Sequence, residues 1–248
     1  MKTARISKTA CAVKSAPSND AESSSEVLFG ETLLVQESTD NFSKVKILRD
    51  GYEGYIETDS FDISDLTATH WVANKATLVF ERADIKSVVV RRILFGSELV
   101  IVDYSSDGRF LQLHDGGFVE AQHCLKAGVF LSSGMIEIGR HHYLNAPYLW
   151  GGRSSDGCDC SGLVQMLAMA RGIDLPRDSK DQQISLNNDI GFSDRLAEDL
   201  VFWPGHVGLL ESPDTLFHAT AHSMRCCFEP LQQVIDRAGT PTAIKRLG

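Results

Sequence analysis

An internal repeat in the first half of the chain is the feature that most limits its fold. The stretch 27–35 (VLFGETLLV) matches 93–101 (ILFGSELVI) at a separation of 66 positions, and 10–13 (ACAV) matches 76–79 (ATLV) at the same separation. A later match relates the DGYEGYI segment to HDGGFV at a separation of 63 positions. A unit of about 60 residues therefore occurs twice, and such a small unit has to build its core from a few short elements.

The short apolar runs of each repeat predict β-strands. Residues 44–48 (KVKIL) alternate polar and apolar side chains and stop at 49–51 (RDG), which is a turn sequence. Residues 109–114 (RFLQLH), followed by 115–116 (DG), show the same pattern. Because Gly, Asp and Asn bound the runs and no helical period accompanies them, each repeat is expected to be a small all-β unit.

A unit of this size, with a Gly-aromatic-aliphatic strand near its end, resembles the bacterial SH3 (SH3b) barrel. The composition changes after about Leu125, so we expect three domains: residues 1–68, 69–127 and 128–248. In the third domain, residues 135–144 carry apolar side chains near helical spacing. This helix is expected to end at 145–147, because the residue before a proline resists α geometry.

Charge and composition exclude several classes of protein. The 248 residues carry a net charge of −9, which repels phosphate backbones, so we expect no nucleic-acid partner. No stretch approaches the roughly 18 apolar residues of a membrane span, so we expect no membrane partner. The basic N-terminus is followed by no apolar segment, so we expect no signal peptide and a cytoplasmic location. Such a location favours free thiols for the six cysteines, Cys11, Cys124, Cys158, Cys160, Cys226 and Cys227.

A cysteine is expected at the start of a helix in the third domain. Apolar spacing predicts a helix over 161–171, with Asp159 as its N-cap and Gly172 just after its C-terminus. This places Cys160 in the first turn, where the helix dipole and unpaired N–H groups favour a thiolate. Asp159 opposes that charge, so an imidazolium partner is needed for the thiolate to exist at neutral pH.

Two histidines follow in strand-like segments. Residues 200–203 predict a strand, 204–205 a turn, and a second strand begins at His206. After a turn at 212–214, a third strand contains His218. A spacing of 12 residues suits two paired antiparallel strands, so the two rings are expected side by side. A nucleophile, a base and a group that orients the base form the general arrangement for covalent catalysis.

Together these segments resemble the NlpC/P60 family of cell-wall cysteine peptidases. The matching stretches are WGG (150–152), DCSGLVQ (159–165), DLVFW (199–203), GHVG (205–208) and FHA (217–219). The resemblance implies an α+β fold: a papain-like domain preceded by two small all-β SH3b-like barrels. With those barrels, the chain is similar to the γ-D-glutamyl-L-diamino acid endopeptidases. Their substrates are murein tripeptides and tetrapeptides with a free N-terminal L-alanine, so we expect a hydrolase of cell-wall recycling that needs no metal or other cofactor.

The resemblance also implies a role for each site residue. Cys160 is expected to be the nucleophile, His206 the base and His218 the group that orients it. Tyr148 is expected to stabilise the oxyanion beside the N–H of Cys160. Asp159 and Ser161 are expected to bind the substrate's amine. The pocket for this amine is expected to be completed by Tyr55, Tyr52 or Glu57 from the first repeat. One departure from the family pattern is Glu198, which stands where a turn glycine usually precedes Asp199.

Other interpretations of these residues remain open at this point. Asp159 and Ser161 could serve only as helix caps, and Tyr148 could be an ordinary core aromatic residue. Cys158 either becomes oxidised with the nucleophile or packs in the core. A zinc site made from the cysteines and histidines is disfavoured, because Cys-x-Cys and Cys-Cys are poor zinc spacings. The whole chain could also be an inactive wall-peptide-binding module, or an acyltransferase or amidase on the same papain-like fold.

Overall fold

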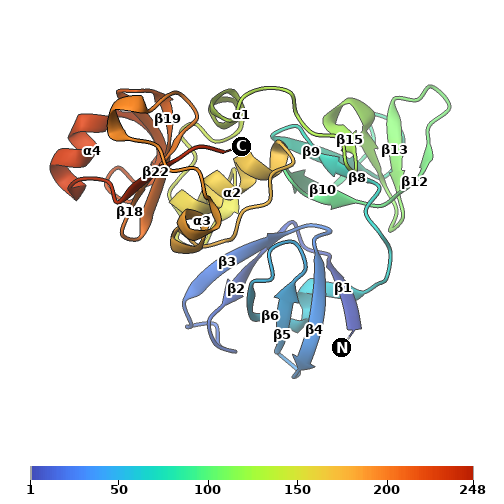
Figure 1. The fold of residues 1–248 in the computed structure, drawn as a ribbon. Helices are drawn as coiled ribbons and strands as arrows, with labels where there is room; N and C mark the ends of the chain where they lie inside the picture. The colour runs from blue at the N-terminus through green and yellow to red at the C-terminus, as the bar shows by residue number, and fades with distance from the viewer. Residues whose placement is uncertain (1, 248) are drawn as a thin grey trace. The chain divides into compact units, whose positions relative to one another are not determined.

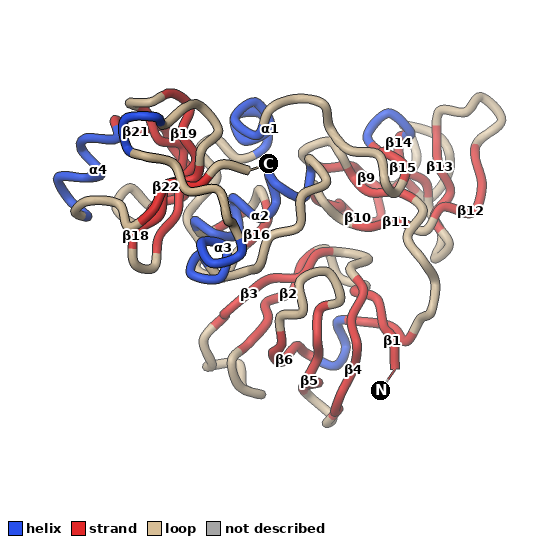
Figure 2. Tube along the Cα trace, viewed as in Figure 1, coloured by secondary structure: helices blue, strands red, loops and turns tan. Residues whose placement is uncertain are grey.

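The computed structural model describes residues 2–247 (Figures 1 and 2). The chain forms two compact units, which divide between Leu131 and Ser132. The first unit is built almost entirely from strands, and the second combines a five-stranded sheet with four helices. Among the described residues, the helices are all too short or too polar to cross a lipid bilayer.

The first repeat forms a seven-stranded sheet in the order β3-β2-β6-β5-β4-β1-β7. Its core contains aliphatic side chains from alternate strand positions, such as Val45 and Ile47 in the predicted KVKIL strand. The turn predicted at 49–51 is present, and Gly51 adopts a φ of 77°, which favours glycine. The strands are β1 (Lys2–Ile6), β2 (Ala10–Lys14), β3 (Ser23–Leu28), β4 (Thr32–Ser38), β5 (Phe42–Ile47), β6 (Glu53–Glu57) and β7 (Phe61–Ile63).

The second repeat forms a five-stranded and a three-stranded sheet, ordered β10-β9-β14-β13-β12 and β11-β8-β15. The predicted strand around 109–114 is β13, which pairs with β14 across a turn at Gly116 (φ 96°). The strands are β8 (His70–Val72), β9 (Ala76–Phe80), β10 (Val89–Leu94), β11 (Glu98–Leu99), β12 (Ile101–Tyr104), β13 (Phe110–Leu113), β14 (Phe118–Glu120) and β15 (Cys124–Lys126).

The two repeats pack tightly against each other. Phe29, from the first repeat, is buried in the core of the second. Gly30 has a φ of 76°, and a Cβ there would lie 1.8 Å from the carbonyl oxygen of Glu98. Arg49 of the first repeat bridges Glu31 at 3.0 Å and Glu98 at 2.7 Å. The predicted all-β fold of this half is therefore confirmed, while the boundary at 68/69 stays a prediction.

The second unit is an α+β domain around the sheet β21-β20-β19-β18-β22. Its first helix ends at His142, a little before the predicted end, and Asn145 then adopts a positive φ of 65°. The elements are α1 (Met135–His142), β16 (Arg153–Ser154), β17 (Gly157–Cys158), α2 (Cys160–Ala170), α3 (Ser179–Ser185), β18 (Leu200–Trp203), β19 (His206–Ser212), β20 (Thr215–Thr220), β21 (Arg225–Pro230), α4 (Leu231–Ala238) and β22 (Ala243–Lys245).

The central sheet of this unit is covered on both faces. Side chains on one face, including Leu210 and Leu216, pack with Leu231 and Val234 of α4. On the other face lie α1 and α2: a Cβ at Gly139 of α1 would lie 2.4 Å from the ring of Phe217, and α2 packs on β19 and β20. Figure 1 shows α4 on one side of the sheet and α2 on the other. Because successive residues of a strand point to opposite faces, every central strand carries apolar residues on both.

Candidate active site

Cys160 is the first residue of helix α2, as the sequence predicts. The side chain of Asp159 caps the helix, and its Oδ1 accepts a hydrogen bond from the N–H of Gly162 at 2.7 Å. The helix ends at Arg171, and Gly172 has the positive φ (77°) of a C′ glycine. Cys160 is only 6% exposed. Its N–H belongs to the first turn, where backbone donors have no partner within the helix.

His206 and His218 lie side by side, also as predicted. Strands β19 and β20 pair antiparallel with Leu209 opposite Phe217, which places both histidines on the same face of the sheet. The Nε2 atom of His206 lies 2.9 Å from Nδ1 of His218. The short β18–β19 turn brings Trp203 against the ring of His206, with 5.9 Å between ring centroids. The hairpin thus determines both the position and the orientation of the base.

The thiol lies against the backbone that flanks His206. Sγ of Cys160 is 4.0 Å from the carbonyl oxygen of Gly205, and the N–H of Val207 also bonds to the sulfur. Since Nε2 of His206 is engaged by His218, Nδ1 is the ring nitrogen that remains for the thiol. This arrangement can perform proton transfer between a sulfur nucleophile and an oriented imidazole.

A carboxylate that sequence reasoning missed completes the chain of polar groups. Nε2 of His218 lies 3.1 Å from Oε2 of Glu229 on β21. Arg237 of α4 bonds to both oxygens of that carboxylate, at 2.7 and 2.9 Å. The signal in the sequence is only positional: Glu229 faces Leu216 across the β20–β21 pair and so shares the face of His218. To predict that Glu229 lies beside His218, the strand register has to be known, and no motif in the sequence contains it.

Burial keeps the thiol and the imidazoles uncharged in the free protein. Desolvation, followed by the charge of Asp159, raises the pKa of the Cys160 thiol to about 11. Desolvation lowers the pKa of His206 to about 4, and the pKa of His218 also to about 4. The helix dipole and an imidazolium partner would favour a resting thiolate, as expected from the sequence, whereas burial in the structure favours the neutral thiol. The proton therefore stays on sulfur until a substrate is attacked, and His206 is already in the unprotonated form that a base requires.

This protonation state makes a prediction for alkylation by iodoacetamide. With a pKa near 11, only about one thiol in 10⁴ is ionised at pH 7, and that fraction rises about tenfold for each pH unit up to the pKa. The alkylation rate of Cys160 should rise in the same way between pH 7 and 10. Peptide mass spectrometry at each pH measures it, with the Cys160→Ala variant as the blank. A rate that is already constant below pH 7 would show a resting thiolate instead.

Asp159 and Ser161 form a buried polar cluster with Arg177. Nη1 and Nη2 of Arg177 donate to the two carboxylate oxygens of Asp159 at 3.1 and 2.6 Å, and Nη1 also donates to the hydroxyl of Ser161 at 2.9 Å. The second carboxylate oxygen accepts a further bond from the N–H of Gly151 at 2.9 Å. Asp159 therefore holds the WGG segment, the helix and the loop after it together. Its predicted role in binding an amine stays a prediction.

The other predicted site residues lie in both units. The N–H of Tyr148 donates to Met224, and burial, followed by the charge of Cys160, raises the pKa of its hydroxyl to about 12. That hydroxyl therefore remains a donor at every physiological pH. Tyr55 and Glu57 belong to β6 of the first unit, where Glu57 pairs with Lys8 at 3.1 Å. Their predicted role in an amine pocket is not tested by these contacts.

Cys158 packs in the core rather than against the nucleophile. Its Sγ lies 3.2 Å from Sγ of Cys226, and both residues are fully buried. The backbone of residues 145–147 lies between the two cysteines. The N–H of Asn145 donates to the carbonyl oxygen of Cys226, and the N–H of Cys158 donates to the carbonyl oxygen of Pro147. Both cysteines are free thiols in the structure.

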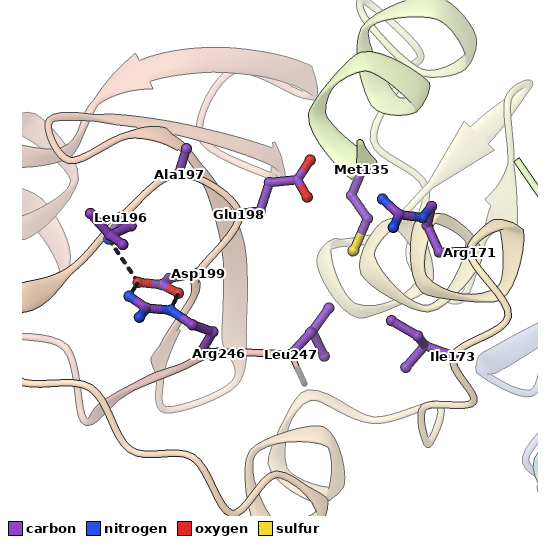
Figure 3. A pocket seen from close by; sticks show the side chains of 9 residues that line it. All are labelled: Met135, Arg171, Ile173, Leu196, Ala197, Glu198, Asp199, Arg246 and Leu247. Carbon is purple, nitrogen blue, oxygen red and sulfur yellow. Dashed lines mark hydrogen bonds and ion pairs between the residues drawn. The ribbon is translucent and has the colours of Figure 1, made fainter. Parts of the chain in front are cut away.

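A cavity of the second unit lies away from the thiol. Figure 3 shows its lining, which includes Arg171 at the C-terminal end of α2, the end opposite Cys160. Glu198 also lines it, in the positive φ (69°) of the turn where the family pattern has glycine. The carboxylate accepts a bond from the N–H of Ile136 at 3.2 Å, so it caps α1. That contact, which glycine could not make, offsets the backbone strain.

Comparison with known proteins identifies both parts of the chain. Residues 145–235 match the NlpC/P60 family, and residues 13–61 match the bacterial dipeptidyl-peptidase Sh3 domain. The chain carries an NlpC/P60 domain. NlpC/P60 proteins are a family of cysteine peptidases related to peptidoglycan, so Cys160, the cysteine at the start of α2, lies within a peptidase domain.

Several relatives and solved structures resemble this chain. Dipeptidyl-peptidase 6 of Lysinibacillus sphaericus is 26% identical, over 82% of each chain. The γ-D-glutamyl-L-lysine dipeptidyl-peptidase of Bacillus subtilis is 35% identical, but only over 31% of this chain and 28% of its own length. A crystal structure of an NlpC/P60 family protein from Bacillus cereus superimposes with a TM-score of 0.82 at 17% identity, covering 98% and 99% of the two chains. The predicted fold of barrels followed by a papain-like domain is confirmed.

Proposed function

We propose that this NlpC/P60 protein hydrolyses the γ-D-glutamyl–diamino acid bond of murein peptides that carry a free N-terminal L-alanine. The observation that carries the proposal is the position of Cys160. Its thiol, at the start of α2, lies against the backbone on both sides of His206, and His206 is in turn bonded to His218. The set of nucleophile, base and orienting group is thus assembled from elements far apart in the sequence.

In the proposed reaction, Sγ of Cys160 attacks the γ-carbonyl carbon while its proton moves to Nδ1 of His206. The developing oxyanion lies near the N-terminal N–H groups of α2 and accepts a bond from the Tyr148 hydroxyl. His206 then gives the proton to the departing amine of the diamino acid, which leaves a thioester on Cys160. Water, deprotonated by His206, hydrolyses the thioester and regenerates the thiol.

The substrate class is supported by the relatives. The Bacillus subtilis relative is named a γ-D-glutamyl-L-lysine dipeptidyl-peptidase, and the Lysinibacillus sphaericus relative, which aligns over most of its length, is also named a dipeptidyl-peptidase. A dipeptidyl-peptidase removes two residues from a free amino end, so the peptide has to present its terminal ammonium group. We expect a carboxylate or hydroxyl to accept from that ammonium, with Tyr55, Glu57, Asp159 and Ser161 as candidates.

A pair of peptides tests this proposal. L-Ala-γ-D-Glu-diaminopimelate should be cleaved to L-Ala-D-Glu and diaminopimelate, and its N-acetylated form should react at least about 100-fold more slowly, because a neutral amide cannot replace a bound ammonium. Product formation is measured by liquid chromatography and mass spectrometry, with the Cys160→Ala variant as the blank. Equal cleavage of both peptides would contradict amine recognition, and cleavage of neither would contradict the substrate.

We also propose that the reaction serves cell-wall recycling in the cytoplasm, where short murein peptides with free amino ends would be the available substrates. Fractionation of cells that produce the tagged full-length protein tests the location. We expect the protein in the fraction that contains a cytoplasmic marker enzyme. Recovery with the envelope or the culture medium would contradict the proposal while leaving the peptide chemistry unaffected.

A further inference from the structure

We propose that Glu229 sets the protonated nitrogen of both histidines, so that His206 presents a bare Nδ1 to Cys160. Glu229 is a positioning residue, since it acts through His218 and touches neither the thiol nor the substrate. The proposal rests on the proposed function in one respect: Cys160 and His206 are taken as nucleophile and base. The arrangement of protons follows from the hydrogen bonds alone.

The contacts form one unbranched line. Arg237 donates to both oxygens of Glu229, Oε2 of Glu229 faces Nε2 of His218 at 3.1 Å, and Nδ1 of His218 faces Nε2 of His206 at 2.9 Å. The side chain of His218 is fully buried and that of Glu229 is 13% exposed. Water has little access to these nitrogens, so the protein partners decide which of them carry protons.

Each link of this line allows one direction of donation. An ionised carboxylate only accepts, so Nε2 of His218 carries the proton and donates to Glu229. A neutral imidazole has one N–H, so Nδ1 of His218 is an acceptor. The N–H on Nε2 of His206 therefore points at His218, which leaves Nδ1 of His206 as a lone pair. That is the nitrogen left to receive the thiol proton.

Arg237 keeps the first link of the line charged. Its bidentate contact lowers the pKa of Glu229, so the carboxylate is ionised at neutral pH. An arginine has donors and no acceptor, so it also restricts what could replace Glu229. In a Glu229→Gln variant, Arg237 captures the amide oxygen and turns the amide NH₂ toward His218. Nε2 of His218 must then accept, and every donor in the line reverses. His206 would present an N–H to the thiol, which cannot take a proton.

The matched control for this variant is Glu211→Gln. Glu211 lies on β19 of the same sheet and forms an ion pair with Arg140. The substitution therefore also replaces one carboxylate of an arginine pair by an amide, without altering the contacts of either catalytic histidine. A second comparison is Glu229→Asp, which retains the charge and the acceptor-only character.

The test reads the tautomers directly, by long-range ¹H–¹⁵N spectra of the full chain labelled with ¹⁵N-histidine. We expect the proton on Nε2 of both His206 and His218 in the parent chain, in Glu211→Gln and in Glu229→Asp. In Glu229→Gln we expect it on Nδ1 of both rings, with the far-ultraviolet circular dichroism unchanged. Identical tautomers in the parent chain and in Glu229→Gln would overturn the proposal, as would Nδ1–H rings in the parent.

Kinetics then separate this inference from the proposed function. If the peptide substrate is cleaved, Glu229→Gln should lower kcat by about 10²- to 10⁴-fold with little change in KM, as expected when a catalytic base is held in the wrong tautomer. Glu211→Gln should stay within about twofold of the parent. If the peptide is not cleaved but the tautomers reverse as described, the substrate assignment is wrong and the role of Glu229 stands.

Discussion

Replacement of Cys160 by alanine is expected to lower the rate of peptide hydrolysis by at least about 10⁴-fold, the scale seen when a covalent nucleophile is removed. In the proposed reaction the thiol at the start of α2 forms the thioester, and alanine offers no atom that could take over this step. The initial rate of L-Ala-γ-D-Glu-diaminopimelate cleavage measures the effect.

The fold should survive this substitution. Cys160 is buried, but its side chain is small and its polar contacts are weak sulfur contacts with the backbone, so alanine should cost only about 1 kcal/mol of stability. Cys158→Ala serves as a second comparison, because this thiol packs against Cys226 and takes no part in the reaction. Activity retained by Cys160→Ala, or lost equally in Cys158→Ala, would contradict the assignment of the nucleophile.

Replacement of Arg177 by alanine is expected to lower the free energy of unfolding by about 3–5 kcal/mol, because it leaves the carboxylate of Asp159 buried without its counter-charge. The side chains of Arg177 and Asp159 are only 2% and 9% exposed, and two hydrogen bonds join them. Urea denaturation of the full chain measures the loss.

Two further variants show whether the loss comes from the unpaired charge. Arg171→Ala removes an exposed arginine near the end of α2, whose Nη1 donates to the carbonyl of Ser133, and should cost less than about 1 kcal/mol. The double variant Asp159→Asn with Arg177→Met removes both charges and should be more stable than Arg177→Ala alone. A loss below about 1 kcal/mol in Arg177→Ala would show that Asp159 finds another partner or becomes protonated.

Most of the fold follows from local patterns in the sequence. The strand and turn at 44–51, the helix behind Asp159 and the hairpin around His206 all appear where alternation, capping residues and turn residues predict them. Each depends on neighbours within a few residues, which a single sequence contains. The backbone conformations of Asn145 and Glu198 cannot be predicted in this way, because their positive φ angles are maintained by contacts with distant segments.

The residues of the site also fall into those that local sequence patterns reveal and those that only the tertiary structure reveals. Cys160, His206 and His218 can be found from motifs, and their contact follows from a 12-residue spacing. The pairing of Asp159 with Arg177 cannot be found from motifs, because it needs the loop after α2 to fold back on the N-terminus of that helix. The dipole of α2 by itself favours a thiolate at Cys160, whereas desolvation by the residues packed around the sulfur raises its pKa, and the helix sequence alone does not contain this second effect.

The sequence alone determined the repeated β units, the helix that begins at the cysteine, and the identity of the three central polar residues. These features follow from local backbone preferences and from residue chemistry at short range. Only the tertiary structure decided that Glu229 and Arg237 stand behind His218, and that burial raises the pKa of the Cys160 thiol. Strand register places Glu229 and Arg237, and burial by the whole domain raises the pKa of the thiol. Both effects depend on residues that are distant in sequence.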